Sequence, residues 1–572
     1  MTKLSPTTRL ITPALGLAIF AWSALFAWQG LDFTDLGFSL ATYQQFYSAP
    51  ETNTYFMLNW LTAFLGHWVG ETLGGTVLAY NLAASLTLAL TGVIAYFGLQ
   101  LVFARGWALA GCVFVAFLFT TKANGNWINY NNLTALFFTL GAVTLFYGLH
   151  RERPNWILIA GLVLGANLFI RFPNLLGIGL VVAVILQGLL QHWPWRRTLR
   201  WSLRFIGGYL LGIFLILVLI LFHGHWELYL QSLQGIFGKA VDDNSTHSGS
   251  MLISLFLRDH AYAFVLAGLT IGAGLLMVRL IKDRPVWLRT AVVLLAALAL
   301  AIAFKVIESW KWAVPGLLYL GLLWIAFKEW RARPQLVLLA FIALAILVLA
   351  PLGSSNGIRN AVYGQWLALP LVLIWLWQGG ATAALPLVPS VAARRLAAST
   401  LIITLVGYSL ASSWFYSYRD STNRFALTQA VDHPLLTGTR TTAERAQVVD
   451  QLLDAMPPWV QPGDTLLAYP DLPTVHFLTE TRSWLDNPWP ILYREAEIQR
   501  RLGEKLAQSA PLPIVVRSLG VTRNRTWPLD APRDESPERE AAWTAFDRFV
   551  QRQSYAVVWS NEFFEILAAE QR

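Results

Sequence analysis

The sequence predicts an all-α polytopic membrane domain of about thirteen transmembrane helices, followed by a small α/β domain outside the membrane. Composition is the first reason, because 56% of the 572 residues are hydrophobic and 13% are charged. A soluble protein of this length cannot bury that much apolar surface. The other two reasons are a regular alternation of basic and polar loops and a change to soluble patterns near residue 418.

Thirteen apolar segments are candidates for membrane spans, since a helix needs roughly 20 apolar residues to cross the hydrocarbon core. Their centres lie near Phe20, Leu88, Val115, Leu140, Leu164, Val182, Leu215, Ala267, Ala296, Leu318, Ala343, Leu371 and Ile403. We expect the first segment to be retained as a helix, because no convincing small-x-small cleavage site follows residues 10–28 and more spans come after it.

The loops between these segments alternate in composition. Lys and Arg cluster in every second loop, at residues 3–9, 105, 151–153, 196–204, 282–289, 328–333 and 394–395. The positive-inside rule places these loops in the cytoplasm. We therefore expect a multi-pass protein of the cell inner membrane with a cytoplasmic N-terminus. After an odd number of crossings, the C-terminal domain would be periplasmic or extracellular.

Two regions depart from the pattern of simple spans. Residues 30–75 contain an apolar stretch too short to cross, interrupted by His67 and Glu71, so we expect one or two helices lying along the outer membrane face. We assign residues 1–418, including these juxtamembrane helices, to the membrane domain. Residues 419–572 are assigned to the soluble extracytoplasmic α/β domain.

Local patterns predict elements within the soluble domain. Thr441-Thr442-Ala443-Glu444 has the form of a capping box that opens a helix. Short apolar runs predict strands, and longer amphipathic stretches predict helices. The expected strands are residues 465–468, 514–516 and 555–559, and the expected helices are residues 490–508 and 537–552.

The predicted outer face carries a short acidic stretch, Asp32-Phe33-Thr34-Asp35-Leu36-Gly37-Phe38, directly after the first span. Partial desolvation of a carboxylate at a bilayer edge is costly, so such residues usually have a function. A carboxylate within hydrogen-bond reach of an acceptor hydroxyl can act as a general base. We therefore predict that Asp35, with Asp32 as the second candidate, is catalytic.

Cationic and hydrogen-bonding side chains share this face. Positive charge stabilises a phosphate leaving group as its bond breaks, so these cations are predicted to hold a donor phosphate. The four are Arg171, Lys305, Lys311 and Arg359. The side chains predicted to contact the sugar or the acceptor are Asn129, Tyr130, Asn131, Tyr363 and His476. Such a set suits a phosphate-bearing lipid headgroup at the edge of a helix bundle.

Structural roles are alternatives for many of the same residues. Asp32 or Asp35 would cap a juxtamembrane helix, and Arg171 would extend to the interface as a snorkelling side chain. Lys305 and Lys311 lie near span ends, where they would anchor the helices. The Asn residues near position 129 would form turns.

The sequence favours neither a metal nor a nucleic-acid partner. His223 and His225 have a spacing that suits a metal, but histidines at an interface are more often solvated, so a divalent metal stays an alternative only. The loop expected at residues 223–260 is long enough to be functional. Cys112 is the only cysteine, which excludes an intrachain disulfide. The net charge of +9 is spread over short loops, as topology signals and contacts with anionic lipids.

This architecture resembles the GT-C superfamily of integral-membrane glycosyltransferases. The most similar group comprises the bacterial protein mannosyltransferases, the aminoarabinose transferases and the lipopolysaccharide-core galacturonosyltransferases. These proteins tend to carry Asp-Glu or Asp-Glu-Gly-aromatic in the first external loop, where this chain has Asp35-Leu36-Gly37-Phe38. The resemblance gives Asp35 the role of catalytic base. Leu36, in place of the usual Glu, weakens the expectation of a paired carboxylate or of a metal at that position.

The external domain carries a second likeness. Residues 463–470 and 475–482 resemble the strand, Pro-containing turn and aromatic-Leu-Thr segment of the same group. The resemblance implies a polyprenyl-phosphate-linked sugar as donor, inversion at the anomeric carbon and release of the lipid phosphate. Its partners would be that donor, a glycan, lipid or protein acceptor, and membrane lipids.

Three other functions are consistent with parts of the sequence. A flippase or transporter for a lipid-linked glycan would need polar residues deep within the spans, and the mid-span positions here are almost wholly apolar. A strongly basic external loop between late spans would favour a glycan ligase or polymerase that uses diphosphate-linked donors. Here the long loop follows the seventh span and is not strongly basic. A non-catalytic scaffold would leave the acidic first loop without a purpose.

Overall fold

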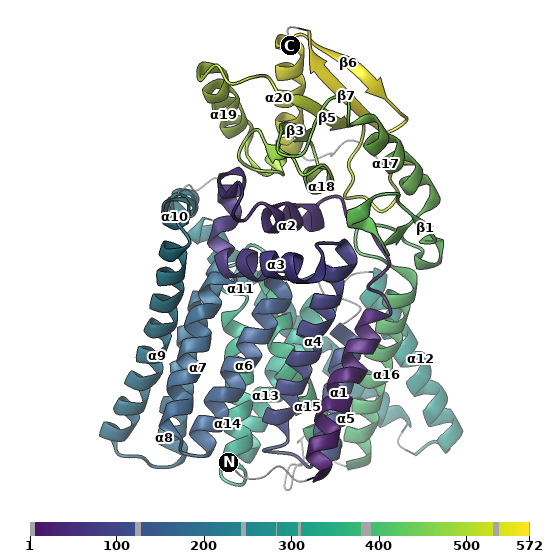
Figure 1. The fold of residues 1–572 in the computed structure, drawn as a ribbon. Coiled ribbons are helices and arrows are strands. Elements are labelled where there is room, and N and C mark those ends of the chain that lie inside the picture. Colours follow the sequence, from purple (N-terminus) through teal and green to yellow (C-terminus); the bar gives the residue numbers. More distant parts are fainter. Residues whose placement is uncertain are drawn as a thin grey trace.

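The computed structural model describes residues 6–119, 127–241, 248–281, 283–306, 310–378, 391–529 and 537–570. A bundle of long helices carries a smaller α/β domain at one end, which we call the domain end (Figure 1). The chain starts at the opposite end of the bundle, which we call the N-terminal end (Figure 1). The two ends are separated by the length of the membrane-spanning helices.

Helices occupy all thirteen predicted span positions. Nine of the helical segments in the described part of the chain are long and apolar enough to cross a membrane, and four shorter apolar helices stand at the other positions. The bundle contains α1 (Pro6–Ala24), α4 (Val77–Leu99), α5 (Arg105–Phe119), α6 (Tyr130–His150), α7 (Pro154–Ala166), η3 (Phe172–Leu180) continuing into α8 (Val181–Leu190), α9 (Trp195–Phe222), α11 (Gly249–Ile281), α12 (Val286–Val306), α13 (Trp310–Glu329), α14 (Pro334–Leu349), α15 (Gln365–Gln378) and α16 (Val391–Phe415).

Glycines bring α7 and α9 into backbone contact. A Cβ added to Gly161 would lie 2.1 Å from the carbonyl oxygen of Phe205, and one added to Gly208 would lie 2.0 Å from that of Leu158. Only glycine permits this approach, and small residues are the usual means of close helix packing in membranes. Positions that carry no side chain therefore permit the close packing of this helix pair.

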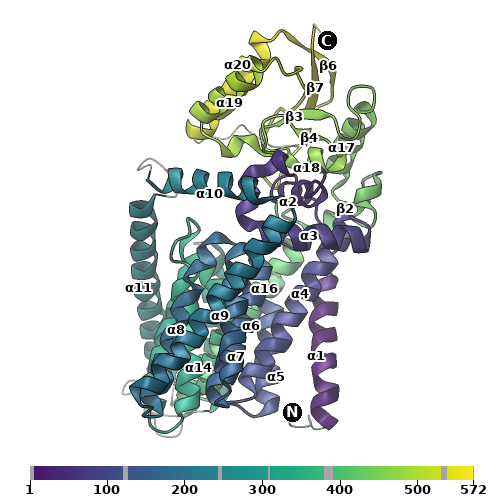
Figure 2. The same cartoon turned by 60° about the vertical axis from the view of Figure 1, so that its left-hand side comes forward.

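A layer of shorter helices covers the domain end of the bundle. It consists of α2 (Asp35–Gln44), η1 (Pro50–Asn59) and α3 (Trp60–Leu73), with α2 and α3 running across the bundle axis (Figure 1). Short helices were expected for residues 30–75, and three helical segments are present; their position along the outer membrane face stays a prediction. Figure 2 shows that α10 (Trp226–Val241) also runs across the axis.

The prediction of a loop at residues 223–260 is wrong. Most of this stretch is helical, in α10 and the first turns of α11. Trp226, Tyr229 and Leu233 recur at helical spacing, and the Tyr229 ring packs 5.7 Å from that of Phe169. Polar composition made the segment look like a loop, although its apolar residues follow a helical period. Asp242 and Asp243 lie outside the described residues.

The C-terminal domain is built on a five-stranded mixed sheet of order β4-β3-β5-β7-β6. Strand β3 pairs in parallel with β4 and with the central strand β5, whereas β7 runs antiparallel to β5 and β6. The strands are β3 (Thr465–Tyr469), β4 (Arg482–Ser483), β5 (Ile514–Ser518), β6 (Tyr555–Ser560) and β7 (Phe564–Ala569), and the helices are α17 (Ala443–Ala455), α18 (Pro473–Leu478), α19 (Glu495–Ala507) and α20 (Pro537–Arg552). A separate ribbon joins β1 (Gln429–Ala430) to β2 (Arg440–Thr441).

The three predicted strands and the predicted helices of this domain are present. Sequence analysis missed β4, which is too short to show alternation, and β7. The predicted capping box is shifted by one position, since Thr442 rather than Thr441 caps α17 by accepting a hydrogen bond from the Arg445 amide. Thr441 is instead buried, and its hydroxyl bonds to Asp420.

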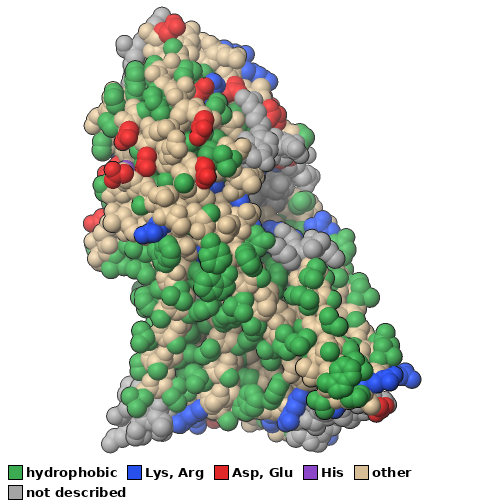
Figure 3. Space-filling model, turned by 90° about the vertical axis from the view of Figure 1, so that its right-hand side faces the viewer, with side chains coloured by type: hydrophobic (Ala, Val, Ile, Leu, Met, Phe, Trp, Pro, Cys, Tyr) green, Lys and Arg blue, Asp and Glu red, His purple; other side chains and the backbone are tan. Residues whose placement is uncertain are grey.

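The helices α2, η1 and α3 share one hydrophobic core with the C-terminal domain. Phe33 lies between the two, with its ring 5.0 Å from that of Trp527 and 6.1 Å from that of Phe564. The juxtamembrane layer is therefore held between bundle and domain. Figure 3 shows apolar side chains covering the bundle, Lys and Arg at its N-terminal end, and acidic side chains over the domain.

Candidate active site

Asp32 lies just before α2, which begins within the acidic stretch, and its carboxylate accepts hydrogen bonds from the start of that helix. Its carboxylate accepts hydrogen bonds from the Thr34 amide (2.9 Å), the Thr34 hydroxyl (2.6 Å) and the Leu36 amide (3.0 Å). The residue is 3% exposed. Burial raises the pKa of Asp32 to about 6, against the lowering effect of the nearby Arg419 charge. The geometry gives Asp32 the capping role that sequence analysis held as an alternative.

Asp35 presents its carboxylate at the start of α2. One oxygen, Oδ2, accepts a hydrogen bond from the Tyr418 hydroxyl at 2.6 Å and pairs with Arg419 Nη1 at 2.9 Å. The other, Oδ1, makes no hydrogen bond to a residue that the structure describes. The side chain is 30% exposed. Asp35 is thus held through one oxygen and keeps the other available, as a base that receives a proton must.

Arg419 reaches Asp35 from the segment that joins α16 to the external domain. Its backbone adopts a positive φ of 48°, a conformation that ordinary residues rarely adopt. Its guanidinium also donates to the Thr34 hydroxyl and lies over the rings of Tyr418 (5.4 Å) and Trp489 (5.9 Å). Burial opposes the charge, but Asp35 and Asp32 raise the pKa of Arg419, so the side chain stays protonated.

A buried ion pair fixes the position of this segment. Asp420 and Arg445 pair with both side chains fully inaccessible. Asp420 also accepts hydrogen bonds from the Leu31 amide (2.6 Å) and the Thr441 hydroxyl (2.9 Å). The Asp420 carboxylate therefore joins the first loop, the segment after α16 and the external domain, and Tyr418 and Arg419 are positioned as part of that junction.

Arg171 stands on the bundle side of the site, in the break between η2 (Asn167–Phe169) and η3. It is 9% exposed. It donates to the hydroxyls of Ser354 (2.7 Å) and Tyr363 (3.3 Å), and the Asn360 amide oxygen, when oriented toward it, accepts at 2.9 Å and 3.0 Å. All these acceptors are neutral. Within the described ranges, no carboxylate lies within salt-bridge distance of Arg171.

Tyr130 connects the two halves of the site. The Arg171 guanidinium lies 5.8 Å from the ring centres of both Tyr130 and Tyr363. Tyr130 also interacts electrostatically with Asp35, and the Tyr363 hydroxyl donates to Asn131. The structure thus brings together five of the residues that sequence analysis singled out. Two residues that it missed, Tyr418 and Arg419, complete the site.

Other predicted residues have structural surroundings. Asn129 caps α6, accepting from the Asn131 amide at 2.8 Å and donating to the Trp127 carbonyl at 3.0 Å. His476 is 1% exposed within α18, its Nδ1 lies 3.2 Å from the Thr481 hydroxyl, and burial lowers its pKa to about 3. These surroundings match the turn alternative for Asn129 and place His476 in a core.

The remaining predicted cations differ in their settings. Arg359 is exposed on η4 (Gly357–Gly364), directly before Asn360. Lys311 lies over the Trp312 ring at 4.5 Å, close to the start of α13. The side chain of Lys305 lies outside the described part of the structure. Of the four, Arg171 has the most developed set of contacts around its guanidinium.

The two interface histidines make hydrogen bonds with aromatic side chains. The Tyr47 hydroxyl lies 3.1 Å from His223 Nδ1, and Trp60 Nε1 donates to His225 Nδ1 at 3.0 Å. Burial lowers the pKa of His225, and the nearby His223 adds to that shift. Among the residues that the structure describes, no group of three or more His, Cys, Asp or Glu side chains is arranged to hold a metal ion.

Two solved structures share this architecture. ArnT from Cupriavidus metallidurans bound to undecaprenyl phosphate aligns with a TM-score of 0.53 at 11% identity, over 99% of this chain and 98% of that chain. The Archaeoglobus fulgidus oligosaccharyltransferase in complex with zinc and sulfate aligns with a TM-score of 0.50 at 13% identity, over 89% of this chain and 68% of that chain. No protein-family model and no curated protein matches the sequence. The chain therefore shares the fold of these two polytopic membrane proteins, and a polytopic fold with a small C-terminal sheet domain is what the sequence predicted.

Proposed function

We propose that this protein is a glycosyltransferase that takes a sugar from a polyprenyl phosphate and transfers it, with inversion, to a glycan, lipid or protein acceptor. One observation carries the proposal. An accessible carboxylate, Asp35, and a buried cation without a carboxylate partner among the described residues, Arg171, both lie near Tyr130. The chemistry needs a base for the acceptor and a positive charge for the departing phosphate. The ArnT structure that shares the fold holds undecaprenyl phosphate.

Asp35 acts on the acceptor. Its Oδ1 takes the proton of an acceptor hydroxyl while the acceptor oxygen bonds to the anomeric carbon. The bond from that carbon to the phosphate oxygen breaks, and its electron pair leaves with polyprenyl phosphate. Attack from the face opposite the leaving group inverts the anomeric configuration. Tyr418 and Arg419, bound to Oδ2, hold the carboxylate in place during the transfer.

Arg171 acts on the leaving group. Its hydrogen-bond partners orient the guanidinium without neutralising it, so its full charge is available to a phosphate. A charge-assisted bond to the phosphate strengthens as negative charge builds up on the leaving oxygen. The exposed Arg359, next to Asn360 in sequence, supplies a second cation at the edge of the site.

The site would face the periplasm or the cell exterior. Basic loops gather at the N-terminal end of the bundle (Figure 3), and the positive-inside rule places such loops in the cytoplasm. The domain end, with Asp35 and Arg171, would then lie at the outer face of the inner membrane. A lipid-linked donor would reach this face with its chain in the bilayer and its phosphate at the rim of the bundle.

The test compares purified wild-type protein with Asp35→Asn. Both are given a panel of polyprenyl-phosphate sugars and a host membrane extract as acceptor, and released polyprenyl phosphate is measured. We expect wild-type turnover and a loss of about 10²–10⁴-fold in Asp35→Asn, which is the usual contribution of a general base. Glu51→Gln, at an exposed acid of the same external loop, serves as control and should keep full turnover. Equal turnover in Asp35→Asn would reject Asp35 as the base.

A further inference from the structure

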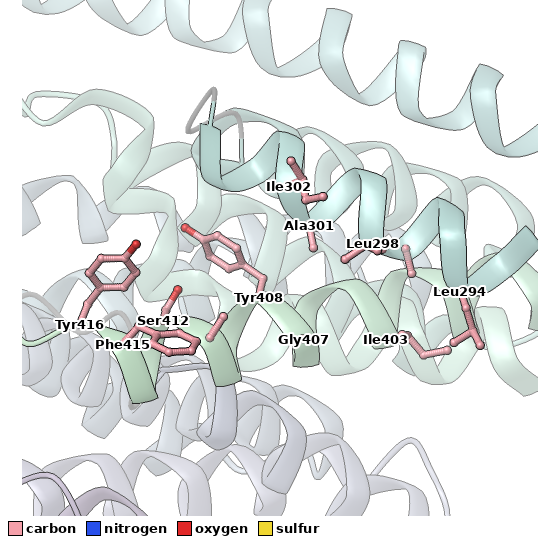
Figure 4. A pocket seen from close by; sticks show the side chains of 12 residues that line it. Leu294, Leu298, Ala301, Ile302, Ile403, Gly407, Tyr408, Ser412, Phe415 and Tyr416 are labelled. Atoms are coloured by element: carbon pink, nitrogen blue, oxygen red, sulfur yellow. The ribbon is translucent and has the colours of Figure 1, made fainter. Parts of the chain in front are cut away.

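An apolar groove lies on the side of the bundle, between α12 and α16 (Figure 4). Its cavity volume is about 450 Å³. Leu294, Leu298 and Ile302 line it from α12, and Ile403, Tyr408 and Tyr416 line it from α16 and the residue after its end. The two helices touch beside it, where the Thr404 hydroxyl donates to the Ala297 carbonyl at 3.4 Å. The groove contains none of the residues of the candidate active site.

The groove opens sideways, toward the position of the lipid. Leu294, Leu298 and Ile302 are 52%, 57% and 53% exposed although they line a cavity. The α16 side runs from Ile403 to Tyr416, a rise of about 20 Å at 1.5 Å per residue. The hydrocarbon core is about 30 Å thick, so the groove covers one leaflet on the domain side together with its interface. Its length suits one lipid chain.

The end of the groove nearest the external domain is polar. The hydroxyls of Tyr408, Ser412 and Tyr416 gather there (Figure 4), and Arg525 of the external domain lies over the Tyr416 ring at 5.0 Å. Arg525 is exposed and has no carboxylate partner among the residues that the structure describes. An apolar channel one leaflet deep therefore ends at a hydroxyl-lined rim with an available cation.

We propose that this groove binds one glycerophospholipid with a net negative headgroup, from the leaflet on the domain side. An acyl chain would occupy the channel between α12 and α16, and the phosphate would sit at Arg525 and the Ser412 hydroxyl. Apolar contact supplies the burial energy, and the arginine selects an anionic over a zwitterionic headgroup. The lipid binds whether or not the chain transfers a sugar.

The occupant is distinct from the proposed donor. The cation proposed for the donor phosphate, Arg171, contacts Tyr130 and does not line the groove, whereas the groove ends at Tyr416, two residues before Tyr418, which bonds to Asp35. A lipid in the groove would therefore lie beside the segment that holds Asp35. It would not need to leave when the donor binds.

Gly407 provides a direct way to block the groove. It lines the cavity, and a Cβ added there meets nothing within 4 Å, so Gly407→Leu would fill the channel without disturbing the helix backbone. Gly268 on α11 is equally open and lies outside the groove, which makes Gly268→Leu the matched control. Arg525→Gln removes the headgroup contact. Arg552→Gln, at an exposed arginine of α20, is its control.

The experiment is native mass spectrometry of the full chain. The protein is released from nanodiscs that contain phosphatidylcholine and a limiting amount of phosphatidylglycerol bearing a photoreactive acyl chain. We expect wild type to retain phosphatidylglycerol in preference to phosphatidylcholine, with crosslinks in residues 403–416. Gly407→Leu should lower the retained fraction at least threefold, and Arg525→Gln should remove the preference for phosphatidylglycerol. The two controls should match wild type.

Three outcomes would overturn the proposal. Wild type could retain no phosphatidylglycerol beyond its share in the nanodisc, Gly407→Leu could retain as much as Gly268→Leu, or the crosslinks could fall outside residues 403–416. A fourth outcome would be loss of the crosslinks when undecaprenyl phosphate is added before irradiation, because the groove would then belong to the donor chain. Each result is independent of sugar transfer, so it leaves the role of Asp35 to the turnover assay.

Discussion

The arginines near Asp35 and the arginine in the helix bundle have opposite settings. On the side of the external domain, Arg419 pairs with Asp35 and Arg445 pairs with Asp420, so these cations meet carboxylates. On the side of the bundle, Arg171 is held by hydroxyl and amide groups and by two aromatic faces. The charges of Arg419 and Arg445 are therefore balanced by carboxylates, whereas the hydrogen-bond partners of Arg171 are neutral.

This difference separates structural cations from a ligand-binding cation. A buried arginine whose charge is matched contributes to position, because removal of either partner leaves an uncompensated charge. A buried arginine surrounded by neutral acceptors is oriented but not neutralised, and such a group suits an incoming anion. The comparison places Arg445 at the junction and Arg419 against Asp35, and it supports the proposal that Arg171 binds the phosphate.

The largest expected effect is a loss of stability when the buried pair of Asp420 and Arg445 is broken. Asp420→Asn leaves the Arg445 charge buried without a carboxylate, and breaking a buried pair in this way costs about 3–5 kcal/mol. Thermal unfolding in detergent would measure the loss. Glu504→Gln, which breaks the exposed pair with Arg500, should change stability by no more than about 0.5 kcal/mol. An Asp420→Asn protein as stable as this control would contradict the assignment of the pair to the junction.

Arg171 should show its effect in donor use rather than in stability. Arg171→Gln keeps hydrogen-bonding capacity but removes the charge, and loss of one charge-stabilising group typically lowers turnover by about 10²–10³-fold. We expect kcat/KM for the polyprenyl-phosphate donor to fall by about 10²-fold. Arg482→Gln, at an exposed arginine of the external domain, should leave it unchanged. A normal kcat/KM in Arg171→Gln would remove Arg171 from the phosphate site.

Arg419 should act through Asp35 and therefore affect a different kinetic constant. Arg419→Gln frees the carboxylate to take other orientations, and we expect kcat to fall about tenfold, an effect of about 1.4 kcal/mol. The donor KM should stay within about twofold of wild type, in contrast to Arg171→Gln. Arg419→Lys should recover part of kcat, because a cation returns near Asp35. A rise in donor KM without a change in kcat would place Arg419 on the phosphate instead.

The smallest expected effect is a pH dependence at Asp32. Burial raises the pKa of Asp32 from its ordinary value of 3.8 to about 6, so between these values the folded protein binds a proton that the unfolded chain does not. Stability contributed by this group is therefore lost as pH rises from about 4 to 6 and is level above that range. Asp32→Asn should lack this component. The measurement is the melting temperature of wild type, Asp32→Asn and the control Glu51→Gln from pH 4 to 8. Parallel curves for wild type and Asp32→Asn would contradict the prediction.

Some of this site was readable from individual residues. An acidic residue followed by Leu-Gly-Phe after the first span identified Asp35, and placement in outer-face loops identified Arg171, Tyr130, Asn131 and Tyr363. Sequence analysis had no signal for Arg419. It lies 384 positions from Asp35 in the chain, and nothing local distinguishes it from the other arginines near span ends. His476 is the opposite case. Its residue type and its segment predicted a contact with the sugar or the acceptor, but its side chain is enclosed in the core.

The sequence by itself determined the elements of this protein. The thirteen apolar segments and most of the strands and helices after residue 418 depend on the local period of apolar side chains, which the sequence shows directly. The exceptions were α10, β4 and β7. Tertiary structure decided which charges are matched. Whether an arginine meets a carboxylate, a hydroxyl or solvent depends on the packing of α2 and α16 against the external domain, and that packing joins residues hundreds of positions apart.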